Sequence, residues 1–360
     1  MNALAGFEAL AAGRAIDDDA NYQWRVARAP AGLPTPEDFV WHDADIPQPR
    51  PGEVLLKTLY LGLAPVMRMY MQGGGAAGEA ALYPGDVIHG RGVAQIIKSR
   101  HPDWHEGEIV QGQLGWQTYK VSAMTTGEKM FRCRPLGLPA MLSCKLLGMT
   151  GLSAHAGLFA CGEPRQGDRM ILSGAAGGVG TIVSQLAANV AGCDVVGIAG
   201  GARKCATIRT LGCSGAIDYQ AEDVAVALAT HRPDGIDLYF DNVGGDILSA
   251  VLERLAMRAR IVLCGSISEY AADSGYALTN YTLLRRTDSR MQGFFVYNHL
   301  DRWDVVMDEL ASYIHDGRLR PVQDIEQGFE RMPLALAKLY TGGNIGTQLC
   351  SVRGEPGEWR

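Results

Sequence analysis

Residues 174–180 read GAAGGVG, so this stretch contains four glycines and two alanines and presents almost no side chain to its surroundings. The apolar run RMILS comes before it, and TIVSQLAANVA, a segment with the length and composition of a helix, comes after it. A strand that enters a helix through a bare glycine turn is the setting of a dinucleotide-binding loop. The alternative that this pattern leaves open is a tight strand-to-helix turn without a ligand.

The glycines of this loop have separate expected roles. Gly177 would let the backbone approach a pyrophosphate, and Gly180 would let the helix pack closely against the strand. The amides at the helix N-terminus would then bind the phosphates, because they carry the positive end of the helix dipole. The expected phosphate contacts are Gly177, Gly178, Val179 and Gly180.

The spacing of apolar runs divides the chain into two kinds of region. From about residue 20 to 135, runs such as GEVLLKTLYLGL alternate with Pro, Gly and Asp, which predicts a mostly β domain. From about 140 to 315, short apolar runs such as GIDLYFDNVGG, ARIVLCGS and RMQGFFVYN alternate with segments of helical length, which predicts βαβ units and a parallel sheet. We therefore expect an α/β protein with a β domain over 1–137, a nucleotide-binding domain over 138–315 and a segment, 316–360, that rejoins the first domain.

Composition and charge exclude several classes of protein. The 360 residues are 47% apolar and 20% charged, which is close to the average for globular proteins. A net charge of −6 without any run of five basic residues argues against a nucleic-acid partner. No apolar segment approaches the roughly 20 residues of a membrane span. The acidic segment AIDDDANYQW differs from a secretory signal, and the eight cysteines show no close pairing, so we expect a cytoplasmic protein with reduced thiols.

The type of dinucleotide is predicted from the end of the second strand in the α/β region. Enzymes selective for NAD commonly place an acid there to bind the ribose hydroxyls, but CDVVGIA is followed by GGARKCA, which contains no acid. Arg203 and Lys204 stand there instead, and two cations suit the 2′-phosphate of NADP(H). A solvated first turn of a helix is the alternative for this pair, although acids are more favoured there.

Neither a metal site nor a serine nucleophile is expected. A catalytic zinc needs three protein ligands, whereas the β region has no cysteine before Cys133, and His89 is its only histidine near a predicted strand end. Ser173 lacks the flanking glycines of a nucleophile elbow. The chemistry is therefore assigned to the cofactor, which the protein positions.

Motifs along nearly the whole chain resemble those of one enzyme family. They are WRVARAPAGLPTPEDF, LGMTGLSAHAGL, GAAGGVG, GIAGGARK, FDNVGG, CGSISEY, QGFFVYN and GNIGTQL. The chain resembles the zinc-independent medium-chain dehydrogenase/reductases, in the group that contains prostaglandin reductases, alkenal double-bond reductases and NADPH-dependent curcumin reductase. The resemblance implies a GroES-like catalytic domain built from both chain ends, a Rossmann domain between them, and a homodimer.

The resemblance also implies a reaction, in which NADPH delivers hydride to the β-carbon of an α,β-unsaturated ketone or aldehyde. The enolate that develops needs hydrogen-bond donors at its oxygen. In the family these are thought to be a tyrosine and the nicotinamide ribose, and the tyrosine corresponds to Tyr270 in CGSISEY. A phenol with a pKa of about 10 is protonated at neutral pH and can donate. Packing over the cofactor is the alternative role for Tyr270.

Further cofactor contacts are implied residue by residue. Tyr219 would approach the 2′-phosphate beside Lys204, or it would only cap a strand end. Asn242 would bind the ribose or nicotinamide, and Asn344 would also contact the cofactor, whereas turn formation is the alternative for both. The remaining implied contacts are Gly200, Cys264, Ser266 and Phe295.

Two departures from the family concern the substrate. The family usually has D-P-Y-M-R where this chain has APVMR, so Ala64 and Val66 replace an acid and an aromatic residue near the expected substrate entrance. His155 stands where tyrosine is common, either as a second proton donor or as a tolerated aromatic replacement. We expect a shifted substrate range, with the pocket lined by Val66, His155 and Tyr297.

Three functions remain open from the sequence. The first is NADPH-dependent reduction of the C=C bond of an enone or enal. The second is quinone reduction on the same scaffold. The third is NADPH binding without catalysis, which the altered APVMR segment keeps open and Tyr270 disfavours.

Overall fold

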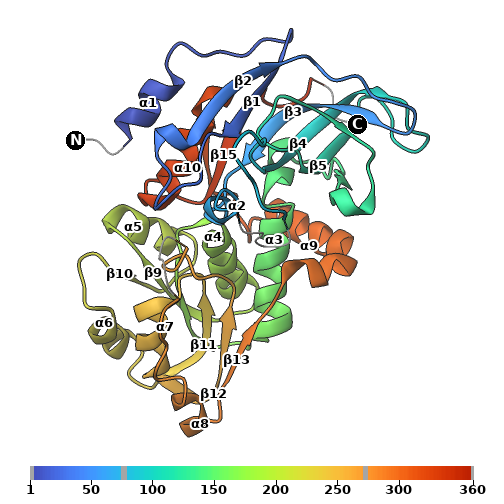
Figure 1. Cartoon of the computed structure of the whole chain (residues 1–360). Coiled ribbons are helices and arrows are strands. Elements are labelled where there is room, and N and C mark those ends of the chain that lie inside the picture. Colours follow the sequence, from blue (N-terminus) through green and yellow to red (C-terminus); the bar gives the residue numbers. More distant parts are fainter. Residues whose placement is uncertain (1–3, 74–78, 271–274, 358–360) are drawn as a thin grey trace. The chain divides into compact units, whose positions relative to one another are not determined.

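The computed structural model describes residues 4–73, 79–270 and 275–357 (Figure 1). Two compact units are present: one joins both chain ends, Met1–Gly148 and Asp324–Arg360, and the other is Met149–Gln323. The sequence predicted boundaries after residues 137 and 315, which are somewhat earlier than the observed boundaries after Gly148 and Gln323. The predicted architecture, a β-rich domain built from both ends with an α/β domain between them, is confirmed.

The first unit is built on a seven-stranded sheet in the order β14-β15-β3-β4-β5-β7, with β6 also paired with β3. The ladders from β15 through β7 are antiparallel, as is the separate β1–β2 pair. The strands of this unit are β1 (Asn21–Val26), β2 (Phe39–Ala44), β3 (Val54–Gly62), β4 (Arg91–Ser99), β5 (Ile109–Gln113), β6 (Tyr119–Ser122), β7 (Phe131–Arg132), β14 (Gln323–Gln327) and β15 (Thr347–Ser351). Its α-helices are α1 (Ala5–Ala11), α2 (Met67–Tyr70) and α10 (Met332–Tyr340).

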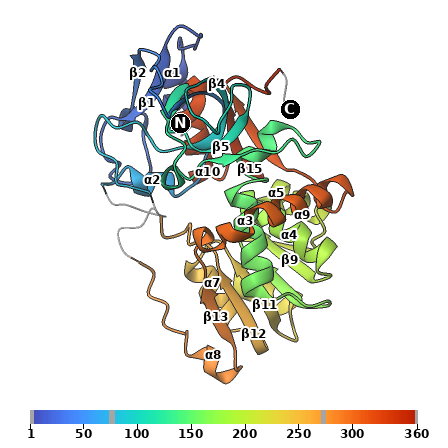
Figure 2. The same ribbon diagram turned by 90° about the vertical axis from the view of Figure 1, so that its right-hand side faces the viewer.

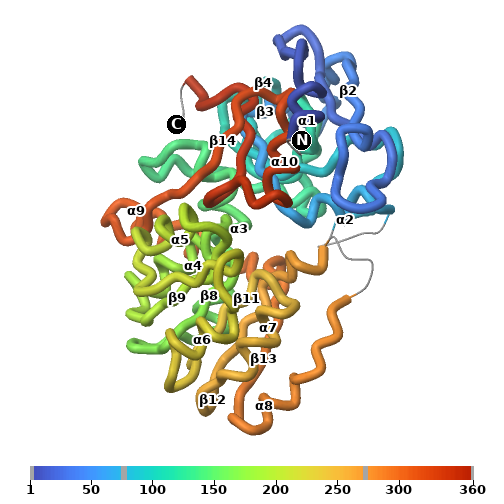
Figure 3. The backbone as a smooth tube through the Cα atoms, turned by 90° about the vertical axis from the view of Figure 1, so that its left-hand side faces the viewer, coloured from blue at the N-terminus to red at the C-terminus, as the bar shows by residue number. Residues whose placement is uncertain are grey.

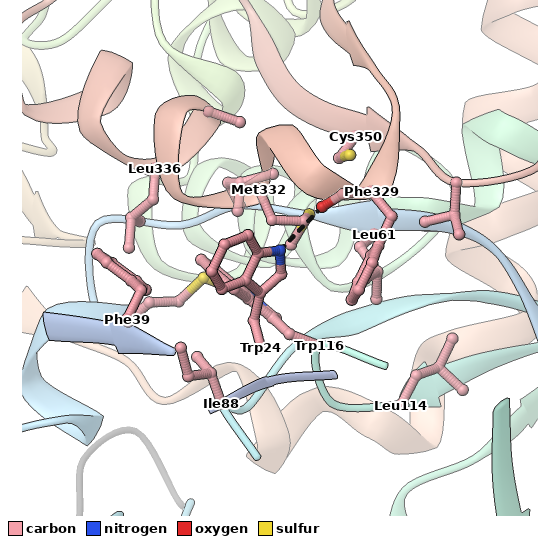
Figure 4. Close-up of a cluster of buried hydrophobic side chains, with 14 of the residues drawn as sticks. Trp24, Phe39, Leu61, Ile88, Leu114, Trp116, Phe329, Met332, Leu336 and Cys350 are labelled. Atoms are coloured by element: carbon pink, nitrogen blue, oxygen red, sulfur yellow. Dashed lines mark hydrogen bonds between the residues drawn. The ribbon is translucent and has the colours of Figure 1, made fainter. Parts of the chain in front are cut away.

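Residues from both chain ends meet in the core of the first unit (Figure 4). Trp24 donates from its indole Nε1 to the carbonyl oxygen of Phe329 at 3.0 Å. Phe39 stacks on Trp116, with ring centroids 5.9 Å apart. All four side chains are buried. Because large aromatic side chains dominate the energetics of such a core, this cluster joins the C-terminal segment firmly to the N-terminal one.

The second unit contains a six-stranded sheet in the order β10-β9-β8-β11-β12-β13, in which each neighbouring pair is parallel. The strands are β8 (Arg169–Leu172), β9 (Asp194–Ala199), β10 (Gly215–Asp218), β11 (Ile236–Asp241), β12 (Leu255–Leu263) and β13 (Arg290–Gly293). The central strands are buried on both faces, which explains their nearly continuous apolar runs. The strand order reverses between β8 and β11, and open α/β sheets bind ligands at such a switch point.

Helices cover both faces of this parallel sheet. They are α3 (Met149–His155), α4 (Gly178–Gln185), α5 (Ala202–Thr210), α6 (Val224–His231), α7 (Gly245–Leu252), α8 (Leu283–Arg286) and α9 (Trp303–His315). Helices α3, α4 and α9 pack together (Figure 2), and α6 and α7 pack together on the other face (Figure 3). Helices α3 and α4 continue as the π-helices Ala156–Gly162 and Leu186–Val190. The unit is therefore a doubly wound Rossmann sheet.

Candidate functional site

The glycine loop turns from β8 into α4, and its bare sequence is required first by its own packing. Gly177 is the N-cap residue of α4, with φ −84° and ψ −179°. Gly174 has a φ of +58°, which residues with a side chain rarely adopt. A Cβ atom at Gly180 would meet the carbonyl oxygen of Gly174 and lie 2.7 Å from the Cα of Ala175. The first amides of α4 have no intrahelical acceptor, as at the start of any α-helix.

A buried acid at the end of β11 ties the glycine loop to the neighbouring strand. Asp241 Oδ1 accepts hydrogen bonds from Ser173 Oγ and Tyr239 Oη, both at 2.7 Å. The same oxygen accepts from the amides of Val243 and Gly244, at 2.9 and 3.0 Å. Asp241 is only 1% exposed, and four donors compensate for the hydration that a buried acid loses.

Asn242, an expected cofactor contact, fixes the same loop. Its side-chain Nδ2 donates to the carbonyl oxygen of Ser173, and its backbone amide donates to Ser173 Oγ, both at 2.8 Å. We did not predict Ser173 or Asp241 as parts of the site from the sequence. A signal was present, because an acid ends the apolar run IDLYFD and a small polar residue ends RMILS.

Ser173→Ala is expected to lower the free energy of unfolding by about 1–3 kcal/mol, because it removes one of the four donors to Asp241 Oδ1 and leaves the partly buried Asn242 backbone amide without its acceptor. Urea unfolding of the variant and the wild type measures this difference. The matched control is Ser184→Ala, since the buried Ser184 hydroxyl bonds the carbonyl oxygen of Thr181 within its own helix at 3.2 Å. A loss as large in the control would contradict a special role for the Ser173 hydroxyl.

The ends of β9 and β10 bring together the residues expected at the 2′-phosphate. A Cβ atom at Gly200 would lie 2.8 Å from both Cζ and Oη of Tyr219, so the tyrosine ring lies directly over this glycine. Tyr219 remains 49% exposed. Arg203 is exposed and Lys204 is partly buried in the first turn of α5, which contains no acid. Two cations and one phenol therefore occupy the carboxyl edge of the sheet here.

An acid does lie close to this edge, but its carboxylate is engaged by the backbone. Asp218, the last residue of β10, accepts hydrogen bonds through Oδ1 from the amides of Gly201 at 2.7 Å and Gln220 at 3.1 Å. The bond from Gly201 holds the turn between β9 and α5, and the bond from Gln220 holds the turn after β10. Asp218 was not predicted from the sequence, because this residue follows the third strand of the sheet, whereas the acid of an NAD-selective enzyme is expected after the second.

Tyr270 lies in the turn after β12, and Asp241 also holds the start of this turn through hydrogen bonds. The amides of Cys264 and Gly265 donate to the carbonyl oxygen of Asp241, at 2.8 and 3.2 Å. The Tyr270 hydroxyl oxygen accepts a long hydrogen bond, 3.5 Å, from the Ser266 amide. A single residue at the switch point thus anchors both the glycine loop and the segment that leads to Tyr270.

The titration of this segment favours protonated side chains. Burial raises the pKa of the Tyr270 phenol, and the hydrogen bond from the Ser266 amide opposes that shift. The phenol is therefore protonated at neutral pH and able to donate. Burial raises the pKa of the Cys264 thiol to about 12, so Cys264 is not a thiolate nucleophile at neutral pH.

His155, expected in the substrate pocket, is buried in α3 and engaged by α9. Its Nε2 lies 2.7 Å from Glu309 Oε2, and its ring centroid lies 4.7 Å from that of Phe159. Burial lowers the pKa of the His155 imidazole, and the Glu309 carboxylate opposes this shift. Glu309 was not predicted from the sequence, because it lies 154 residues further along the chain.

Two further expected contacts follow β13. Tyr297 lies in the 3₁₀-helix Val296–Arg302, and its ring centroid is 5.0 Å from that of Phe295. Phe295 is 44% exposed. This aromatic pair, in which Tyr297 is partly buried, belongs to the second unit and lies beyond the carboxyl end of an outer strand of its sheet.

Val66 and Asn344 belong to the first unit. Val66 is the N-cap residue of α2, and the carbonyl oxygen of the preceding Pro65 accepts a hydrogen bond from Tyr340 Oη at 2.6 Å. Asn344 is 7% exposed, and its Nδ2 donates to the carbonyl oxygen of Gly346 at 3.0 Å. The C-terminal segment therefore fixes both positions within this unit, whereas the other expected site residues lie in the second unit.

The described part of the chain shows neither a cluster of metal ligands nor a helix that could span a membrane. Among residues 4–73, 79–270 and 275–357, no three His, Cys, Asp or Glu side chains are grouped to hold a metal ion. All eight cysteines are free thiols. No helix in these described ranges combines the length and the apolar character that crossing a bilayer requires.

Two family models match parts of the chain. A model described as the N-terminal domain of oxidoreductase matches residues 22–130. A model described as zinc-binding dehydrogenase matches residues 178–312. The first match lies within the first unit, and the second lies within the second unit.

Known proteins are similar over nearly the whole chain. The putative NADP-dependent oxidoreductase YfmJ of Bacillus subtilis is 38% identical over 335 residues, which cover 92% of this chain and 97% of that protein. The NADPH-dependent curcumin reductase of Escherichia coli is 34% identical over 349 residues, covering 93% and 98%. The crystal structure of CurA in complex with NADPH from Vibrio vulnificus matches with a TM-score of 0.85 at 34% identity, covering 92% and 99%.

Proposed function

Because the chain belongs to the zinc-independent medium-chain dehydrogenase/reductases, in the group of the curcumin, alkenal and prostaglandin reductases, we propose that it uses NADPH to reduce the C=C bond of α,β-unsaturated ketones and aldehydes. One observation carries this proposal. Tyr270, whose phenol is protonated at neutral pH, lies in a segment that starts from the same Asp241 that anchors the glycine loop.

The glycine loop fits the pyrophosphate of NADP(H). A side chain at Gly180 would collide with the loop itself, and the first amides of α4 suit phosphate oxygens. We assign the phosphates to Gly177, Gly178, Val179 and Gly180, and the nicotinamide with its ribose to Asn242, Cys264, Ser266 and Phe295.

The cations of α5 fit the 2′-phosphate. Arg203 and Lys204 lie in a first turn that contains no acid, and Tyr219 lies over the adjacent Gly200. Charge-assisted hydrogen bonds from such cations to phosphate are stronger than neutral ones. The carboxylate of Asp218 bonds backbone amides, so we do not assign it to a ribose hydroxyl.

In the proposed reaction, bound NADPH would supply the hydride that adds to the β-carbon of the substrate, and a proton from solvent would complete the reduction at the α-carbon. Tyr270 donates a hydrogen bond to the carbonyl oxygen, where negative charge accumulates as the enolate forms. We assign His155 and Tyr297, both in the second unit, to contacts with the substrate. We assign His155 a role in shape and not in proton transfer, because its Nε2 is engaged by Glu309.

The direct test is the loss of NADPH absorbance with a panel of enones, enals, quinones and saturated alcohols, together with the mass of each product. We expect a saturated carbonyl product from an enone. Turnover of quinones alone would replace the proposal with quinone reduction. Tight NADPH binding without any turnover would favour a protein that binds the cofactor without catalysis.

Arg203→Ala is expected to raise KM for NADPH about tenfold or more, because one charge-assisted bond to phosphate contributes about 1.5–3 kcal/mol. NADH provides the internal control, since it lacks the 2′-phosphate. Steady-state kinetics with both cofactors measure the effect. An equal rise of KM for NADH would assign Arg203 to the stability of α5 and not to phosphate recognition.

We also propose that the protein is a homodimer in the cytoplasm. Strand β13 ends the strand order of the parallel sheet and is largely exposed, and open sheet edges favour pairing with another chain. The eight free thiols suit a reducing compartment. Light scattering during size-exclusion chromatography tests the dimer, and a monomer mass would contradict it.

A further inference from the structure

Hydrogen bonds fix the chain on both sides of Lys145 in the first unit. The Glu355 carboxylate accepts hydrogen bonds at 2.8 and 3.0 Å from the two amides that open the 3₁₀-helix Ala140–Cys144. Just beyond Lys145, the Leu147 carbonyl oxygen accepts a hydrogen bond from Gln111 Nε2 at 2.8 Å. Because both ends of this short segment are fixed, the starting point of the Lys145 side chain is fixed as well.

The lysine stem occupies the space over a glycine. A Cβ atom at Gly62, the last residue of β3, would meet Lys145 Cε and lie 3.1 Å from its Cδ. The segment that follows β3 contains Ala64 and Val66, which depart from the family pattern near the expected substrate entrance. Lys145 therefore lies beside the strand that leads into this segment, within the same unit.

The ammonium group has an unusual electrostatic environment for a lysine. Among the described residues, it has no hydrogen-bond or ion-pair partner. Burial lowers its pKa to about 8; the Cys144 thiol opposes this shift, and the like charge of Arg91 adds to it. The residue is only partly buried, so part of its side chain is accessible.

A lowered pKa leaves more of this amine in the neutral form, which is the nucleophilic one. Roughly one tenth of a lysine with such a pKa is neutral at pH 7, compared with less than about one in a thousand for an ordinary lysine. A neutral amine can attack a carbonyl carbon, and desolvation beside another cation is a known way to activate lysine for Schiff-base chemistry.

We propose that Lys145 is a covalent capture site for aldehydes of the α,β-unsaturated class. The amine nitrogen forms a bond to the carbonyl carbon, and the carbonyl oxygen leaves as water with two protons, which gives a conjugated imine. The stem packed over Gly62 and the fixed segment around Lys145 present the amine without a competing carboxylate among the described residues. The choice of aldehyde class rests on the proposed function, whereas the reactivity of the amine does not.

The test is reductive trapping on the full-length protein without NADPH. The protein is incubated with cinnamaldehyde and cyanoborohydride at neutral pH, and the modified residue is identified by peptide mass mapping. We expect Lys145 to be the most heavily labelled lysine, and the labelling to rise with pH to half its maximum at about pH 8. Labelling spread evenly over surface lysines would overturn the proposal, as would an adduct heavier than the reduced imine by one oxygen atom, which would indicate conjugate addition.

Two variants test the geometry. Lys145→Arg keeps the charge but removes the nucleophile, so it is expected to lose the label. Gly62→Ala displaces the stem toward water, and the label is expected to fall roughly tenfold as the pKa recovers by about a unit or more. Undiminished labelling in Gly62→Ala would overturn the packing argument. If Lys145→Arg does not fold, the peptide map of the wild type still decides the proposal.

The outcomes for Lys145 and for the proposed function are separable. Labelling at Lys145 in a protein that oxidises no NADPH with any enone would keep the capture site and reject the reductase. NADPH oxidation without labelling at Lys145 would keep the reductase and reject the capture site.

Discussion

Gly180→Ala is expected to lower the affinity for NADPH more than about tenfold and the melting temperature by roughly 2–12 °C. The new Cβ atom would meet the carbonyl oxygen of Gly174 and lie 2.7 Å from Ala175 Cα, and these are backbone atoms that cannot rotate away. The loop must therefore open, which displaces the amides that are proposed to hold the phosphates. Thermal unfolding and fluorescence titration with NADPH measure the two effects.

Two other glycines separate collapse of the loop from loss of the cofactor contact. A Cβ atom at Gly177 would lie 3.2 Å from the carbonyl oxygen of Gly174, so Gly177→Ala is expected to keep most of the stability but to weaken NADPH binding. Gly127 lies in the first unit with its nearest neighbouring atom at 3.9 Å, so Gly127→Ala is expected to change neither property. Wild-type affinity in Gly180→Ala would show that this loop does not hold the phosphates.

The parallel sheet could be predicted because its signals are local. Each of its strands overlaps an apolar run that was expected to form one, and segments of helical length separate these runs. Parallel pairing follows from that alternation, since each strand needs a crossover before the next. The split of the first unit between both chain ends could be expected from the return of strand-like pieces after residue 316.

One strand is shorter than the sequence suggests. The run RMQGFFVYN was expected to be a strand, but only Arg290–Gly293 is extended, and a 3₁₀-helix begins at Val296. The register gives the reason. Gly293 pairs with Leu263, the last residue of β12, after which that chain turns onto the carbonyl oxygen of Asp241. Residues beyond Gly293 therefore have no strand beside them to pair with.

The hydrogen-bond network under the glycine loop could not be predicted in the same way. The bareness of the loop is visible in seven consecutive residues, whereas Ser173 and Asp241 are 68 residues apart. They meet because the β8–β11 register pairs Leu172 with Phe240, which places the next residue of each strand side by side. The partnership of His155 and Glu309 has the same origin, since it depends on how α3 packs against α9.

Tyr270→Phe is expected to lower kcat with an enone by about a hundredfold or more, while KM for NADPH and the melting temperature change little. The phenol is proposed to donate to the enolate oxygen only as charge develops there, so its loss acts on the transition state and not on cofactor binding. Its bond from the Ser266 amide is long, 3.5 Å, and removing that bond costs the folded protein little. Single-turnover kinetics with premixed NADPH isolate the hydride-transfer step.

Tyr276→Phe is the matched control for Tyr270→Phe, because it removes a phenol from the same connection between β12 and β13. Tyr276 Oη donates to Asp246 Oδ1 at 2.9 Å, at the start of α7, and the residue is 40% exposed. Its loss is therefore expected to leave the single-turnover rate close to that of the wild type. If both variants lose the rate equally, the phenols act through the integrity of this connection. If Tyr270→Phe keeps the wild-type rate, another donor must stabilise the enolate, and Tyr270 is left with the packing role.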